Sequence, residues 1–429
     1  MRFEEAVAGL DLRQPEHMPK PDLDRIRALT TLLNDPQLTY PTIHVTGTNG
    51  KTTTARLCAS LACEHGISTG LFTSPHLLSV IERLVVCGVP IGPDEFGREF
   101  ERLLPYLRTV DEGVGSVTYF EVVTALAYLW FADKPVGLGV FEVGMGGTWD
   151  ATNLVAGDVA VICPVGLDHP ELGETVAEVA REKAGIIKQG KVAVVREQEP
   201  DALEQIERRC EEQIATLLLE DRDWAIQERA PALGGQAFAV RGLYRTYPDL
   251  HLALFGAHAA RNAGGAVVAL EALLERALDE DVVRGAFTGA SSPGRLEVVA
   301  RHPLIVLDGA HNPAAAEALA AALPEAFAWE RLHLVMAVFS TKDLEGIAAA
   351  LSPIADAGYA ATTDSVRARA ADEVATALVA KGVASQAFAD VGAALEAARE
   401  AAGERDLILV TGSLYTVADA RRMLMGETG

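Results

Sequence analysis

The stretch TIHVTGTNGKTTT (42–54) joins a short β-branched run to a helical segment through a loop with two glycines. The common phosphate-binding loop reads G-x-x-x-x-G-K-[ST], and counting back from the G-K-T triplet at 50–52 reaches Val45 where its first glycine belongs. The nearest glycine is Gly47. The loop still offers glycines, backbone N–H groups, a helix N-terminus and a lysine, which together suit phosphate. We therefore predict a nucleotide site rather than an ordinary strand-to-helix turn.

The alternation of strand, loop and helix continues on both sides of this stretch. Continuous apolar strands that alternate with helices predict parallel sheets covered on both faces, with ligands at the carboxyl ends of the strands. The segment 225–255 predicts short strands and turns. The further strand candidates are GLFTS (70–74), LGVFEVG (138–144), VAVICPVG (159–166), KVAVV (191–195), LIVLDG (304–309), LHLVMAVF (332–339), GYAATT (358–363) and DLILVTGS (406–413).

The segment TGASSPGRL (288–296) is rich in small residues and contains Pro and Gly, which favours a linker. We predict an α/β protein with a nucleotide-binding domain over 1–290, a linker over 291–296 and a smaller domain over 297–429. The first domain is expected to be P-loop NTPase-like with a mostly parallel sheet, and the second Rossmann-like.

The composition disfavours several classes of partner. The chain has 429 residues, and 37 basic against 60 acidic residues give a net charge of −23, which disfavours nucleic acid and anionic membranes. No segment is long and apolar enough to span a bilayer, and the N-terminus does not resemble an export signal. Five scattered cysteines without a C-x-x-C pair then predict reduced thiols in a cytoplasm, and no disulfide or zinc site.

Charged residues follow the later strands of the first domain. Glu142 ends one strand, Asp168 and His169 follow the next, and Lys183 lies on the helix after them. A strand-end carboxylate beside a phosphate loop is a natural Mg²⁺ ligand. The residues alone therefore predict a Mg²⁺-dependent, ATP-using enzyme. A GTPase should carry an N-K-x-D motif that reads guanine, and the nearest segment, STKDLE (340–345), lacks the Asn. The alternative from another class is a nucleotide-binding module without enzyme activity.

Several strings together resemble folylpolyglutamate synthase and its bifunctional relative dihydrofolate synthase, in the Mur ligase superfamily. The matching motifs run in the expected order from about residue 40 to about 416. They are HVTGTNGKTTT, TSPHL (73–77), ER (82–83), FEVGMGGTWDATN (141–153), DH…LG.T…EKAGI (168–186) and DGAHNP (308–313).

The resemblance implies an ATP-dependent amide ligase. ATP phosphorylates a carboxylate of a folate, and the amine of L-glutamate attacks the acyl phosphate. Dihydropteroate is a second candidate acceptor, and whether the protein has one activity or both stays open. The implied cofactors are ATP and Mg²⁺ at two sites, with a monovalent cation as a further candidate. The implied partners are these small molecules only, and the family analogy predicts a monomer.

The resemblance also implies residue roles in the first domain. Lys183 matches a lysine that is carbamylated in the family, and Asn262 matches an adenine contact, with helix packing as its alternative. Either Thr52 or Thr53 would take a metal, because this chain has K-T-T where the family usually has K-G-S. The phosphate group comprises Gly47, Thr48, Asn49, Gly50, Lys51, Thr52 and Thr53, and the metal group Thr52, Thr53, Ser74, Glu142, His169 and Lys183.

In the second domain, the resemblance implies that Arg295 reaches the phosphates, Asp308 holds the ribose, and His311 and Ser413 face the incoming glutamate. A linker salt bridge for Arg295 and helix capping for Ser413 are the alternatives. The implied catalytic residues are Lys51, Lys183, His169 and His311.

A Mur-type ligase of peptidoglycan precursors is the runner-up. Such enzymes usually carry a further N-terminal domain, and we expect no room for one in the roughly 40 residues before the loop. The pterin pocket is expected to involve the segment 15–26 and the loop after Ser74. Ala259 stands where the family usually has Gln, so one polar contact near the nucleotide is expected to differ.

Overall fold

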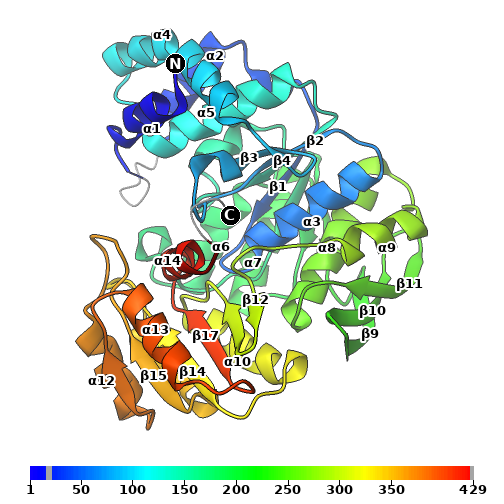
Figure 1. Cartoon of the computed structure of the whole chain (residues 1–429). Coiled ribbons are helices and arrows are strands. Elements are labelled where there is room, and N and C mark those ends of the chain that lie inside the picture. Colours follow the sequence, from blue (N-terminus) through cyan, green and yellow to red (C-terminus); the bar gives the residue numbers. More distant parts are fainter. Residues whose placement is uncertain (16–21, 426–429) are drawn as a thin grey trace. The chain divides into compact units, whose positions relative to one another are not determined.

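The computed structural model describes residues 1–15 and 22–425, which form two compact units (Figure 1). Half of the segment expected at the pterin pocket (16–21 of 15–26) lies outside the described residues. The domain boundaries predicted above stay a prediction. Unit 1 comprises Met1–Arg229, Ala237–Leu252 and Ala259–Ala290, and unit 2 comprises Ala230–Gln236, Ala253–His258 and Ser291–Gly429.

The large sheet of unit 1 has the strand order β4-β3-β2-β5-β1-β6-β7-β8. The six strands from β2 to β8 in this order pair in parallel, and β3 and β4 add an antiparallel edge. The predicted mostly parallel sheet is confirmed. Its strands are β1 (Thr42–Thr46), β2 (Thr69–Phe72), β3 (Leu84–Val86), β4 (Val89–Pro90), β5 (Leu138–Glu142), β6 (Val159–Ile162), β7 (Val192–Val195) and β8 (Thr216–Leu219).

The helices of unit 1 include α5, in which the mostly apolar run from Val122 to Phe131 is buried. Its N-cap, Thr118, accepts a hydrogen bond from the backbone N–H of Glu121, which fixes where the helix begins. The helices are α1 (Phe3–Asp11), α2 (Asp24–Leu32), α3 (Lys51–Glu64), α4 (Pro93–Gly113), α5 (Tyr119–Asp133), α6 (Val176–Ala184), α7 (Pro200–Gln213), α8 (Ala257–Leu274) and α9 (Glu280–Thr288).

The segment 225–255 forms a small sheet with the order β11-β10-β9, as its turn-rich sequence predicts. Its strands are β9 (Ala225–Ala232), β10 (Gly235–Arg241) and β11 (Thr246–Leu252). Short 3-10 helices occur at Pro36–Leu38 (η1), Val80–Arg83 (η2), Ala151–Leu154 (η3), Pro170–Leu172 (η4) and Ser352–Ile354 (η5).

Unit 2 has a six-stranded sheet with the order β12-β13-β17-β14-β15-β16, parallel except for β12. The predicted second α/β domain fold is confirmed. The strands are β12 (Glu297–Arg301), β13 (Leu304–Leu307), β14 (Leu332–Met336), β15 (Ala357–Ala360), β16 (Ser385–Ala387) and β17 (Leu407–Thr411). The helices are α10 (Pro313–Ala326), α11 (Leu344–Leu351), α12 (Ala371–Ala380), α13 (Val391–Ala401) and α14 (Leu414–Met425).

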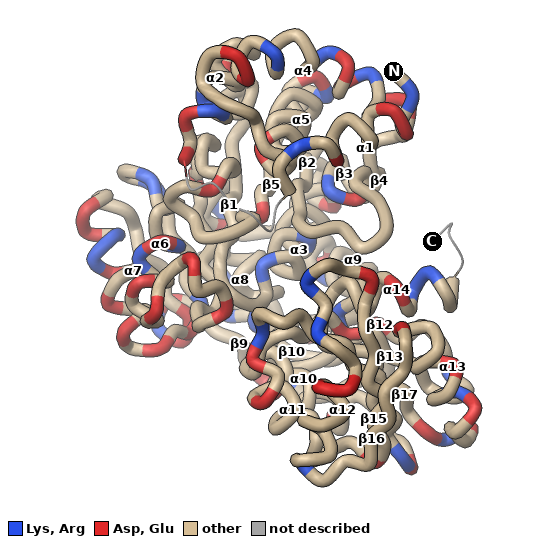
Figure 2. Tube along the Cα trace, turned by 90° about the vertical axis from the view of Figure 1, so that its left-hand side faces the viewer, with Lys and Arg blue, Asp and Glu red and all other residues tan. Residues whose placement is uncertain are grey.

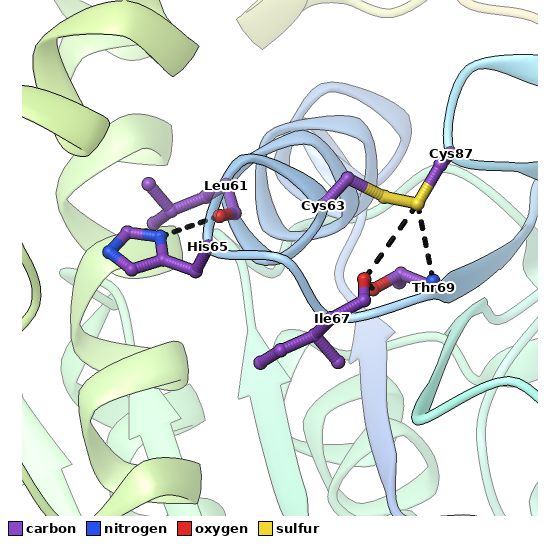
Figure 3. Close-up of a disulfide and its surroundings, with 6 residues drawn as sticks. All are labelled: Leu61, Cys63, His65, Ile67, Thr69 and Cys87. Carbon is purple, nitrogen blue, oxygen red and sulfur yellow. Dashed lines mark hydrogen bonds between the residues drawn. A yellow bond between two sulfur atoms is a disulfide. The ribbon is translucent and has the colours of Figure 1, made fainter.

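The expectation that all cysteines are reduced is wrong in this structure. Cys63, in the last turn of α3, and Cys87, in the turn between β3 and β4, form a disulfide with Cα atoms 5.6 Å apart (Figure 3). The other three cysteines are buried free thiols. The reasoning failed because the absence of C-x-x-C says nothing about cysteines that the fold brings together across 24 residues.

Acidic and basic residues both occur along the surface helix α7, and Figure 2 shows both colours on its tube. Within 1–15 and 22–425, no helix is long and apolar enough to cross a membrane.

Candidate active site

The short glycine loop lies at the carboxyl end of β1, in the middle of the large sheet. Gly47 has φ 145° and Gly50 has φ 88°, backbone conformations that other residues rarely adopt. A Cβ on Gly47 would lie 2.6 Å from Cβ of Cys163, and one on Gly50 would lie 2.9 Å from Oδ1 of Asn262. Both glycines are therefore required by backbone conformation and by close packing.

Lys51 is the first residue of α3 and folds back over the loop. Its Nζ donates to the carbonyl of Gly47 (3.0 Å) and to that of Thr48 (3.2 Å). The Thr48 hydroxyl in turn donates to the Gly166 carbonyl (2.8 Å), and the Asn49 N–H points at the carbonyl of Pro164 (3.5 Å), which ties the loop to the chain after β6. A cation and a helix N-terminus at one short loop are groups that suit a bound phosphate.

Glu142 ends β5, next to β1, and its side chain is almost wholly buried. One carboxylate oxygen accepts the Thr52 hydroxyl (2.7 Å), and the other accepts the backbone N–H of Ser74 (3.1 Å). Because Thr52 contacts this carboxylate, it is better placed than Thr53 to share a metal ion with Glu142. Thr53 is buried at the next position of α3.

This donor set fits Mg²⁺, because a buried carboxylate and hydroxyls are hard oxygen ligands. Among residues 1–15 and 22–425, no group of three or more His, Cys, Asp or Glu residues could hold a metal by itself. Bound Mg²⁺ would therefore also depend on hydroxyls, on water and on oxygens of the nucleotide.

Lys183 reaches the same loop from α6. Its Nζ donates to the Gly47 carbonyl at 2.9 Å, and the side chain is buried. Burial, followed by the charge of Lys51, lowers the pKa of Lys183 to about 7, although the carboxylate of Asp168 opposes the shift. A substantial fraction of this amine is therefore uncharged at neutral pH, which an amine must be to react with CO₂.

His169 lies on the loop after β6, at the start of η4, with its side chain about a third exposed. Its Nε2 lies 3.2 Å from the buried Asp168 carboxylate. The charge of Asp168 acts on the pKa of Lys183, so the loop after β6 that carries Asp168 and His169 lies near Lys183 and the glycine loop.

Asn262, on α8, is buried against Gly50, and its side-chain oxygen accepts a hydrogen bond from Arg196. Arg196 also pairs with the buried Glu220 at 2.8 Å. The sequence reasoning missed Arg196 and Glu220, although Arg196 directly follows the predicted strand KVAVV. These contacts pack Asn262 against the glycine loop, and the adenine contact that the resemblance implies stays a prediction.

In unit 2, Asp308 directly follows β13 and is buried. Its two oxygens accept the backbone N–H groups of Leu296 and Ala310, each at 2.8 Å. Burial raises its pKa, while the charge of Arg295 acts in the opposite direction. His311, two residues beyond Gly309, makes a 2.8 Å hydrogen bond to that residue's carbonyl through Nδ1. The structure therefore groups Arg295, Asp308 and His311.

Ser413 follows β17 and is buried at the start of α14. Its hydroxyl accepts the backbone N–H of Thr416 (3.0 Å) and lies 2.7 Å from the hydroxyl of the same residue. This is an N-cap, the alternative that the sequence left open for Ser413.

Comparisons with known proteins agree with this geometry. The Mur ligase middle domain matches residues 45–270, and the Mur ligase glutamate ligase domain matches residues 294–414. The dihydrofolate synthase/folylpolyglutamate synthase of Mycobacterium tuberculosis is 39% identical, with 97% of this chain and 93% of the relative covered.

Solved structures agree over the whole chain. A Mycobacterium tuberculosis folylpolyglutamate synthase complexed with ADP has a TM-score of 0.95 at 37% identity, covering 99% of this chain and 98% of that one. An Escherichia coli FolC in complex with DHPP and ADP has a TM-score of 0.89 at 29% identity, covering 100% and 99%. Fold, motif order and near-complete coverage coincide, so this chain belongs to the folylpolyglutamate synthase/dihydrofolate synthase family of Mur ligases.

Proposed function

We propose that this protein is an ATP-dependent ligase that joins L-glutamate to a folate through an amide bond. The observation that carries the proposal is the convergence of Lys51, Glu142 and Lys183 on one short phosphate loop. This convergence occurs in a chain that is 39% identical, over 97% of its length, to a dihydrofolate synthase/folylpolyglutamate synthase.

The reaction needs positioning and charge neutralisation more than a protein nucleophile. Lys51 and the backbone N–H groups at the start of α3 hold the phosphates of ATP, while Asn262 borders the adenine. The folate carboxylate attacks the γ-phosphorus and ADP leaves. The amine of glutamate then attacks the acyl carbon of the acyl phosphate, and the tetrahedral intermediate collapses with release of phosphate.

Thr52, Ser74 and Glu142 would hold one Mg²⁺, and His169 with a carbamylated Lys183 would hold a second. Bound Mg²⁺ neutralises charge that develops on the phosphate oxygens. The lowered pKa of Lys183 supports carbamylation, because the uncharged amine is the form that attacks CO₂. A monovalent cation stays a further candidate.

In unit 2, we assign the ribose to Asp308, the phosphates to Arg295 and the incoming glutamate to His311. The grouping of these three residues after β12 and β13 supports the assignment. The protein is expected to act as a monomer in the cytoplasm.

Dihydropteroate is the acceptor of a second proposed activity. The name of the Mycobacterium tuberculosis relative includes dihydrofolate synthase, and the Escherichia coli structure contains DHPP. These two relatives support one site that serves both acceptors.

The test is phosphate release from ATP in the presence of glutamate, with three acceptors added in turn: dihydropteroate, reduced folates and UDP-muramoyl peptides. Stimulation by both pterin acceptors supports both activities, and stimulation by reduced folate alone leaves only folylpolyglutamate synthase activity. Stimulation by the muramoyl peptides alone would overturn the proposal in favour of a peptidoglycan ligase. No stimulation by any acceptor would favour a nucleotide-binding module.

A further inference from the structure

Two loops of unit 2 run side by side beyond the carboxyl ends of β14 and β15. Phe339 and Ala368 form an antiparallel bridge, and the Ser340 N–H donates to the Arg367 carbonyl at 2.9 Å. The Arg369 N–H donates to the carbonyl of Val338 at 3.0 Å. The backbone around Arg367 is therefore fixed by hydrogen bonds on both sides of that residue.

The side chain of Arg367 lies across two aromatic rings. Its guanidinium carbon is 4.4 Å from the ring centre of Phe339 and 5.8 Å from that of Tyr415. The rings themselves meet edge to face, 5.2 Å apart. Phe339 is buried and Tyr415 is 40% exposed, so the rings orient the guanidinium close to the surface of unit 2.

The hydrogen-bonding groups of this guanidinium are not used within unit 2. In the part of the chain that the structure describes, the guanidinium of Arg367 makes no hydrogen bond and no ion pair. The nearby Arg369 differs, since it donates to the Ser340 carbonyl (2.7 Å) and pairs with Glu373 (3.0 Å). Arg369 therefore holds the loop, whereas Arg367 is an oriented cation with five free donors.

The position of Arg367 matches that of a ligand group. β13, β17, β14 and β15 are neighbours, and His311, Tyr415, Phe339 and Arg367 all follow the carboxyl ends of these strands. Ligands of open parallel sheets bind at this edge. His311, at the same edge, is the residue assigned above to the incoming glutamate.

We propose that Arg367 binds the side-chain carboxylate of the incoming L-glutamate and so selects glutamate over glutamine. This inference rests on the proposed function. A guanidinium fork matches a carboxylate with two parallel hydrogen bonds, and a neutral amide cannot replace that charge. The exposed part of the Tyr415 ring offers an apolar surface for the methylene groups of the substrate.

The test compares Arg367→Met, Arg367→Lys and Arg399→Met in the acceptor assay. Methionine keeps an apolar stem on the rings, lysine keeps only a point charge, and the exposed Arg399 of α13 is a control in the same unit. Losing a charge-assisted pair should raise the KM for glutamate roughly 10- to 100-fold in Arg367→Met. The KM values for ATP and folate should stay unchanged, and Arg367→Lys should recover part of the loss.

The preference for glutamate over glutamine should fall by a similar factor in Arg367→Met and stay unchanged in Arg399→Met. An unchanged KM for glutamate with a normal melting temperature would overturn the inference, and so would a rise confined to the KM for ATP. If the unaltered protein shows no glutamate-dependent phosphate release, the proposed function fails as well. If the unaltered protein is active and Arg367→Met has the same KM for glutamate, only the inference about Arg367 fails and the proposed function stands.

Discussion

The charged side chains at the carboxyl ends of the strands have different partners in the two units. In unit 1, Lys51, Glu142 and Lys183 lie buried or half-buried around one glycine loop, and their polar atoms contact the loop and its neighbours. In unit 2, the only partners of the Arg367 guanidinium among the described residues are two aromatic rings. The difference fits the phosphate site proposed for unit 1, where the charges are held in place, and the carboxylate site proposed for Arg367 in unit 2.

The largest effect is expected at the buried edge. Lys51→Ala removes the cation that contacts two carbonyls of the loop, and loss of one positioned group of this kind costs roughly 10³-fold in rate. ATP-dependent glutamate ligation should fall by that factor. Lys191→Ala, a half-exposed lysine of unit 1 paired with Asp158, is the matched control and should keep full activity. A Lys51→Ala protein with near-normal turnover would contradict the phosphate assignment.

The two units also differ in their cysteines, because all five lie in unit 1 and none in unit 2. Cys87→Ser opens the disulfide to Cys63, and loss of a crosslink across 24 residues is expected to lower the stability of unit 1 by roughly 3 kcal/mol. Urea unfolding with and without a dithiol reductant measures this effect. The variant should be insensitive to the reductant, and a parent that is equally insensitive would contradict the prediction.

Lys183→Ala tests whether the second buried lysine acts as a carbamate. We expect a loss of roughly 10²-fold in turnover, with partial recovery on adding formate or acetate, because a small carboxylate can occupy the space of the carbamate. Lys191→Ala again serves as the control. Failure of both anions to restore any activity would count against the carbamate role.

The same lysine predicts a dependence of stability on pH. Its pKa is about 7 in the folded protein and has its ordinary, higher value when unfolded, so the unfolded chain binds more protons between the two values. Stability should therefore rise with pH by about 1.4 kcal/mol per unit above pH 7, relative to Lys183→Met. Denaturant unfolding at pH 7.0 and 8.5 in CO₂-free buffer measures this, and parallel pH profiles would refute it.

The smallest effect is expected at the edge of unit 2. Ser413→Ala removes the N-cap of α14 and should lower the stability of unit 2 by about 1 kcal/mol. If capping is its only role, the KM for glutamate should change less than twofold. A tenfold rise in that KM with unaltered stability would instead restore the substrate contact that the resemblance implies for Ser413.

The sequence predicted the central strands well, because buried parallel strands such as VAVI in β6 are continuous apolar runs between turns. The strands β3, β4 and β8, at the two ends of the large sheet, escaped prediction, since they are short and partly exposed. The glycine loop and the strand-end Glu142 were also recognisable, because both follow an apolar strand directly.

Groups assembled from distant segments could not be predicted in the same way. Arg367 meets Phe339 and Tyr415 only because two loops and the first turn of α14 come together after separate strands. Cys63 and Cys87 meet only because the β3–β4 turn lies beside the end of α3. A single sequence gives no spacing rule for contacts of this kind, whereas the motifs of the phosphate loop lie within a dozen residues.

The disulfide also makes part of unit 1 a closed covalent ring, from Cys63 through β2, Ser74 and η2 to Cys87. A protease that cuts once inside this ring linearises it but does not divide the protein. The cut chain would migrate as one species on a non-reducing gel and separate into two fragments only after reduction. The TSPHL motif therefore lies on a segment whose cleavage leaves both halves of the protein attached.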